Sequence, residues 1–272
     1  MNTSEPQSDP PPPPRGLPPP WIALGEALRF LTVLPVPFAA RWLGPPSALG
    51  VRAGLSGFPL AGWIVGGIAA VLGTGANALA GPGWGAFAAL FAWTGLTLGL
   101  HLDGVADSCD ALFSGRPRAR KLEILKDSRI GAMGAIALGL VLLGAHTGLE
   151  ALGDRLWVGA LLAPPIARFA NLWALARYPT LSTSTLGTGL RDGATPAVLA
   201  LAGLYAFVPG LVIFGPQAAV AFVAAWVCGD WVARAAAKSL GGLSGDLYGL
   251  VNEVGQLAVL FTLSAWPAAA PG

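Results

Sequence analysis

The chain has 272 residues, 54% of them hydrophobic and only 11% charged, whereas about a quarter of the residues in soluble globular domains are charged. Its formal net charge of +2 gives no reason to expect a nucleic-acid partner. The two cysteines, Cys109 and Cys228, lack metal-type spacing, so neither a disulfide framework nor a zinc site is indicated. The composition therefore predicts an integral membrane protein.

The first segment, residues 1–20, is dominated by proline and is predicted to be a disordered tail. It lacks the basic start, apolar stretch and small-residue cleavage site of a signal peptide. The next segment, 21–38, carries Glu26 and Arg29 among apolar residues and ends in a proline-containing stretch. This pattern predicts an interfacial or partly embedded helix rather than a full span.

Long uncharged runs follow, and each is long enough for one or two membrane spans. Glycines between residues 73 and 85 predict a turn between the first two spans. We therefore expect an all-α, polytopic integral membrane helical bundle, with one helical domain over 21–266 and a C-terminal tail over 267–272. About seven spans are predicted, near 53–72, 84–101, 130–148, 156–176, 196–213, 217–237 and 250–266.

The basic residues predict the orientation of these spans. The connection after the second span holds six Lys or Arg residues between positions 116 and 129, and basic loops stay in the cytoplasm. Counting spans outward leaves Glu150, Asp154 and Arg155 on the opposite side. Most acidic side chains then fall on the cytoplasmic side, which would suit an enzyme with a charged, soluble substrate.

The strongest local motif is the acidic segment 101–110, which directly follows an apolar helix. Its aspartates, Asp103, Asp107 and Asp110, are spaced by four and three and fall along one helical stripe. Three like charges near a bilayer repel one another, so a hard divalent cation held by oxygen ligands is expected. The alternative is a solvated acidic helix end that the nearby basic loop partly neutralises.

A second acidic and basic segment follows the loop. Glu123 and Asp127 are four apart, so on a helix they would share a face and form a second carboxylate pair. An ordinary juxtamembrane amphipathic segment is the alternative. Basic groups mixed with metal-binding carboxylates are typical of phosphoryl or phosphodiester transfer, where both neutralise charge.

Polar residues inside the apolar segments are further candidates. Arg168 stands alone in a span, so we expect it to face the bundle interior with a partner. The glycine-rich loop 240–246, with Gly245 and Asp246, either brings backbone N–H groups near phosphates or simply connects two helices. Glu253, at the start of the last span, is expected beside Asp246 and the bound ion.

Other residues give weaker signals. His101 begins the acidic motif and is placed to orient a carboxylate, while Asp230 and Arg234 are four apart and fit an internal ion pair. The sequence has no nucleophile elbow, Walker loop or dinucleotide fingerprint, so serine catalysis and ATP hydrolysis lack support.

Several motifs together resemble one enzyme family, the cobalamin synthases, which are adenosylcobinamide-GDP ribazoletransferases of late vitamin B12 assembly. The similarity extends from about Phe30 to Leu263. Ala111 replaces the glycine usual in the family, and the stretch 178–192 is poorer in charge than usual, which affects expected substrate contacts there. The similar stretches are 30–37, 58–62, 100–110, 122–131 and 240–246.

The resemblance implies a Mg²⁺-dependent enzyme of the bacterial inner membrane that joins adenosylcobinamide-GDP to α-ribazole or its 5′-phosphate and releases GMP. On this hypothesis Asp103, Asp107 and Asp110 hold Mg²⁺ on the diphosphate. Glu123 or Asp127 would be a second ligand or the general base, and Arg129 and Arg168 would hold phosphate oxygens.

Two other functional classes have weaker support from the sequence. A CDP-alcohol-type phosphotransferase also places aspartates at cytoplasmic helix ends, but its usual Ala-Arg pair is absent, because Asp107 follows Ala106. An ion-coupled transporter would place carboxylates near the bilayer midplane between repeated halves, and the chain shows no convincing repeat. A homo-oligomer is compatible with the sequence.

Overall fold

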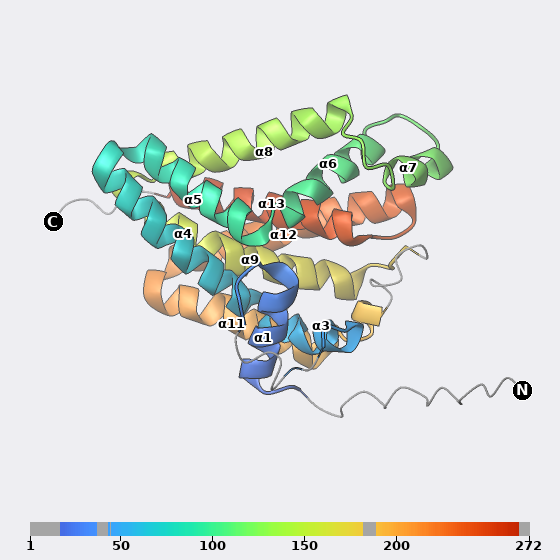
Figure 1. Ribbon diagram of the computed structural model, residues 1–272, viewed down its shortest axis with the longest axis horizontal. Helices are drawn as coiled ribbons and strands as arrows, with labels where there is room; N and C mark the ends of the chain where they lie inside the picture. Colours follow the sequence, from blue (N-terminus) through green and yellow to red (C-terminus); the bar gives the residue numbers. More distant parts are fainter. Residues whose placement is uncertain (1–16, 37–42, 44, 182–188, 267–272) are drawn as a thin grey trace, which may run out of the picture.

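The computed structural model describes residues 17–36, 43, 45–181 and 189–266, and within these ranges nearly all regular structure is helical (Figure 1). Six helices are long and apolar enough to cross a membrane, and a bent helix pair makes a seventh candidate. The expected all-α bundle of about seven spans is therefore confirmed. The predicted tail over 1–20 lies mostly, and the tail over 267–272 wholly, outside the described residues.

The N-terminal part consists of α1 (Pro20–Leu31), the short α3 (Ala48–Gly54) and a 3₁₀ turn, η1 (Leu55–Gly57), that leads into α4. α1 ends before the prolines and is not among the candidate spans. Within it Glu26 is buried and lies 3.5 Å from Arg29, and burial raises the pKa of this carboxyl.

The remaining helices make up the bundle. In chain order they are α4 (Phe58–Ala80), α5 (Pro82–Thr97), α6 (Leu100–Leu112), α7 (Arg118–Ile124), α8 (Ala132–Ala151), η2 (Gly153–Arg155), α9 (Leu156–Arg177), α11 (Pro196–Phe214), α12 (Pro216–Leu240) and α13 (Gly245–Ser264).

The long helices run between two ends of the molecule (Figure 1). One end carries α7, the connections that follow α6 and α12, and the C-terminus of α9, and the other carries the short turns at Gly81, η2 and Gly215. The basic loop at 116–129 thus lies at the same end as the start of α13. We call this the polar end.

The second span is broken, which corrects the expected helix over 84–101. α5 and α6 meet at a bend of 87°, where Leu98 and Gly99 adopt left-handed backbone conformations with φ of 48° and 67°. Glycine takes this conformation without strain. Because of the bend, the acidic motif occupies a separate helix that starts part-way along the bundle and runs to the polar end (Figure 1).

The first span is longer than expected, because α4 continues through Gly73 and Gly75 to Ala80. Gly73 allows close packing instead of a turn, since a Cβ there would lie 2.9 Å from the Cβ of Ala89. Close packing at a glycine also joins α4 to α9, where a Cβ on Gly62 would lie 2.6 Å from the Cα of Pro165. Small residues at helix contacts are typical of membrane bundles.

Candidate active site

The acidic helix α6 crosses the start of α13 at very close range. A Cβ on Gly104 would collide with the backbone of Asp246, and a Cβ on Gly249 would lie 2.9 Å from the carbonyl oxygen of His101. Larger side chains at either glycine would push the two helices apart. The crossing therefore brings Asp246 to the acidic stripe of α6.

Asp107 lies at the centre of the resulting carboxylate cluster. The charges of Asp103, Asp246, Asp110 and Asp127 all act on it. These groups come from three segments: α6, the first turn of α13 and the connection before α8. The expected gathering of acids at one end of the bundle is thus confirmed, with Asp246 as a full member of the cluster.

The cluster has little cationic compensation. Within the described ranges, no Lys or Arg forms an ion pair with Asp103, Asp107 or Asp246. In the same ranges, no three His, Cys, Asp or Glu side chains converge tightly enough to form a ready-made metal cage. Mg²⁺ usually takes one or two carboxylates and completes its shell with water and substrate phosphates. The donor set here fits that mode of binding.

Asp110 has partners of its own at the start of α8. Its two carboxylate oxygens accept hydrogen bonds from the backbone N–H groups of Gly131, at 2.6 Å, and Gly134, at 2.8 Å. A carboxylate here satisfies otherwise unpaired amides and opposes the positive end of the helix dipole. Asp110 therefore caps α8, while its role as a metal ligand stays a prediction.

The expected pairing of Glu123 with Asp127 on one helical face is wrong, because α7 ends at Ile124. Each acid instead pairs with a nearby arginine: Glu123 with Arg120, and Asp127 with Arg129 at 2.9 and 2.6 Å. The hydrogen bonds from Arg129 lower the pKa of Asp127 to about 2. Asp127 lies near Asp107, whereas Glu123 is held on the surface of α7.

Two basic residues of α7 form hydrogen bonds to α12 that could not be predicted from the sequence. Arg118 Nε donates to the carbonyl oxygen of Leu240 at 2.6 Å, and Lys121 Nζ lies 3.0 Å from Ser239 Oγ. Both contacts lie at the C-terminus of α12, where cations are stabilised by the helix dipole. They hold the basic segment against the bundle.

Two backbone donors of the glycine-rich loop after α12 are already paired. The N–H of Gly241 bonds to Ala237, and the N–H of Leu243 bonds to Pro179 at 2.8 Å. Phosphate binding by the remaining donors of 240–246 stays a prediction. Gly245 and Asp246 line a cavity beside Asp103.

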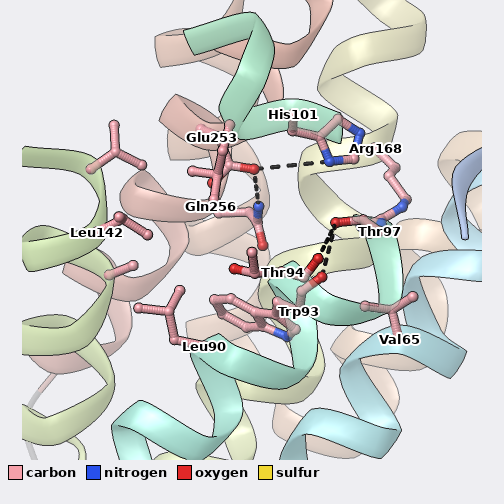
Figure 2. Close-up of a pocket in the computed structure, with 13 residues that line it drawn as sticks. Val65, Leu90, Trp93, Thr94, Thr97, His101, Leu142, Arg168, Glu253 and Gln256 are labelled. Carbon is pink, nitrogen blue, oxygen red and sulfur yellow. Dashed lines mark hydrogen bonds and ion pairs between the residues drawn. The ribbon is translucent and has the colours of Figure 1, made fainter. Parts of the chain in front are cut away.

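A second group of polar side chains is buried deeper in the bundle (Figure 2). Glu253 Oε1 accepts hydrogen bonds from Gln256, at 2.8 Å, and Asn252, at 3.1 Å, and lies 3.9 Å from His101 Nδ1. Arg168 lies on the same cavity, is 1% exposed and donates to the carbonyl oxygen of Pro164. Its charge and that of Glu253 act on each other.

This group confirms one expectation and corrects another. Arg168 does face the bundle interior, where it donates to the carbonyl oxygen of Pro164, although phosphate binding by Arg168 stays a prediction. The expected place of Glu253 beside Asp246 is wrong, because seven residues of helix separate them, about 10 Å along the axis. The sequence also missed Gln256, which carries no motif and is recognised only by its contact with Glu253.

Asp230 likewise has partners other than the expected Arg234. Its Oδ1 accepts hydrogen bonds from Trp173 Nε1 and from the hydroxyl of Tyr178, both at 2.9 Å. Both donors lie at the end of α9, so the contact ties α12 to α9 near the polar end.

Comparison with known proteins identifies the family. Residues 23–264 match the family described as cobalamin-5-phosphate synthase. The chain belongs to this family. A relative from Roseiflexus sp. (strain RS-1), named adenosylcobinamide-GDP ribazoletransferase, is 38% identical over 245 residues, which cover 90% of each chain. No solved structure matches.

Two further cobalamin-5-phosphate synthase relatives carry the same name. That from Herpetosiphon aurantiacus is 41% identical over 249 residues, covering 89% of this chain and 96% of the relative. That from Escherichia coli (strain K12 / DH10B) is 34% identical over 246 residues, covering 87% and 96%. Membership of the cobalamin-5-phosphate synthase family covers every described helix from α4 to α13. It favours a transferase over a transporter.

The cap at α8 predicts a stability difference between two substitutions. Asp110→Ala should lower the free energy of unfolding by about 1 kcal/mol, because two amides of α8 lose their acceptor. Asp110→Asn should recover part of that loss, since it keeps one side-chain oxygen. Thermal unfolding of the purified protein in detergent measures both, with the exposed Asp192→Ala as the control. Equal midpoints for Asp110→Ala and the wild type would contradict the capping role.

Proposed function

We propose that the carboxylate cluster of α6 and α13 is the site where adenosylcobinamide-GDP is joined to α-ribazole, or to its 5′-phosphate, with release of GMP. The ribazoletransferase activity itself follows from family membership. One observation carries the location: Asp107 lies among four other carboxylates from three segments. Such a cluster attracts divalent cations and, through them, a diphosphate.

Mg²⁺ is the proposed metal, and Asp103, Asp107 and Asp246 are the residues that would hold it. When bound, the ion would neutralise charge on the diphosphate and on departing GMP. Asp103 is exposed and Asp107 and Asp246 are partly exposed, so their oxygens remain accessible to an ion and a substrate. Asp110 supports this site by fixing α8 against α6.

The reaction replaces one phosphorus–oxygen bond by another. The acceptor oxygen attacks the phosphorus attached to cobinamide, and the bond from that phosphorus to GMP breaks. The proton of the acceptor hydroxyl passes to a carboxylate of the cluster; Asp127 lies near Asp107, whereas Glu123 is held on the surface of α7. Arg129 is 86% exposed and holds Asp127 through Nε and Nη2, so its Nη1 is proposed to bind phosphate oxygens at the same edge.

The polar end is proposed to face the cytoplasm of the bacterial cell, with the bundle in the cytoplasmic membrane. Its loops hold most of the basic residues, as the positive-inside rule requires, and a nucleotide-activated substrate is a soluble, charged molecule. The opposite end carries Asp154 and Arg155.

Orientation is measured by cysteine labelling in intact cells with a membrane-impermeant maleimide. Asp154→Cys should be labelled from outside, and Arg116→Cys should be labelled only after the cells are permeabilised. The reverse pattern would contradict the proposed orientation.

The role of the cluster is measured by turnover. Asp107→Asn keeps nearly the same volume and removes a charge, so the protein should fold and yet release less than 1% as much GMP, roughly 3 kcal/mol in the barrier. The assay uses purified protein in detergent with adenosylcobinamide-GDP, α-ribazole and Mg²⁺. Asp154→Asn, at the other end of the bundle, is the matched control and should keep full activity. Wild-type turnover by Asp107→Asn would show that Asp107 has no essential role.

A further inference from the structure

A large, mostly apolar cavity opens directly beside the carboxylate cluster. Its volume is about 280 Å³. The polar part of the cavity lining consists of His101, Asp103, Gly245 and Asp246. Its apolar part, between α1, α4 and α9, is lined by Phe30, Leu31, Leu55, Phe58, Leu172 and Leu175.

The apolar part has two features that suit a flat aromatic ligand. The rings of Phe30 and Phe58 are stacked, with centroids 5.9 Å apart, and form an aromatic wall. Asn171 also lines the cavity, is 8% exposed, and its Oδ1 has no hydrogen-bond partner among the described residues. A buried amide without a partner is uncommon in folded proteins, and a bound ligand would satisfy it.

We propose that this cavity holds the benzimidazole base of the acceptor nucleoside, with the ribose and its reacting oxygen directed toward Asp103 and Asp246. This inference rests on the proposed function, which places the reacting phosphorus at those carboxylates. The two methyl groups and carbocyclic ring of the base lie against Leu172 and Leu175. The Asn171 amide supplies an acceptor for a ribose hydroxyl and a donor for the ring nitrogen.

The chemistry of the lining separates this ligand from the other groups in the reaction. Guanine carries hydrogen-bonding groups along most of its edge, and a corrin ring carries many amides. Either would be left with unpaired polar groups in an apolar cavity, at a cost of about 1–3 kcal/mol for each group. A benzimidazole has few polar atoms, so nearly all of its surface can contact the apolar lining of this cavity.

Filling the cavity tests the assignment. Leu175→Trp adds volume inside it, so the KM for α-ribazole should rise at least tenfold, while kcat and the KM for adenosylcobinamide-GDP stay within about twofold of wild type. Leu204→Trp is the matched control, because Leu204 is 53% exposed on the outside of α11, and it should leave all three values unchanged. A rise in the KM for adenosylcobinamide-GDP alone would assign the cavity to the donor and overturn the proposal.

The wild-type protein gives a second test that needs no folded variant. An otherwise identical riboside of unmethylated benzimidazole should have a KM about tenfold higher, because the contacts of two buried methyl groups are lost. Equal KM values for the two ribosides would overturn the proposal.

Direct binding separates this inference from the proposed function. Equilibrium dialysis of α-ribazole against the full chain in detergent requires no turnover. Wild type should bind, and Leu175→Trp and Asn171→Leu should bind at least tenfold and about fivefold more weakly. Equal affinity in all three overturns the cavity assignment even if GMP is released normally. Binding that the variants weaken, without GMP release by the wild type, would instead refute the proposed function.

Discussion

Asp246 can join the acidic stripe of α6 because residue 104, at the crossing of α6 and α13, has no side chain. A Cβ on Gly104 would collide with the Asp246 backbone, so even alanine would force the helices apart. The bend at Leu98–Gly99 is the second requirement. Because of it, α6 crosses α13 and does not run on in the direction of α5. Together these backbone features position four of the five clustered carboxylates, and the Asp110 cap then fixes α8 beside them.

The broken span also creates the space beside the cluster. In a membrane, non-helical backbone is tolerated where protein buries it or where it lines a cavity, and His101, just after the bend, lines two cavities. One is the small cavity lined by Arg168 and Glu253, and the other opens toward Asp103 and Asp246. A charged, accessible edge for phosphate chemistry thus adjoins an apolar space for an aromatic group, within one short stretch of α6.

Features that depend on local composition could be predicted from the sequence, and features that depend on contacts between distant segments could not. The uncharged runs gave the spans, and the four-and-three spacing gave the stripe of Asp103, Asp107 and Asp110. Periodicity cannot show that α7 ends before Asp127, or that Asp110 meets amides some twenty residues later. Glu253 was misplaced because its partners are recognised only once α6, α9 and α13 are packed together.

The most direct measurement of the central claim is the position of the metal. Cryo-electron microscopy of the full chain in lipid nanodiscs, with Mg²⁺ and adenosylcobinamide-GDP bound in the absence of α-ribazole, would show it. The account predicts density for the ion in contact with Asp103, Asp107 or Asp246, and with the diphosphate. An ion and diphosphate bound elsewhere, for example at Arg168 and Glu253, with the α6 and α13 carboxylates empty, would contradict it.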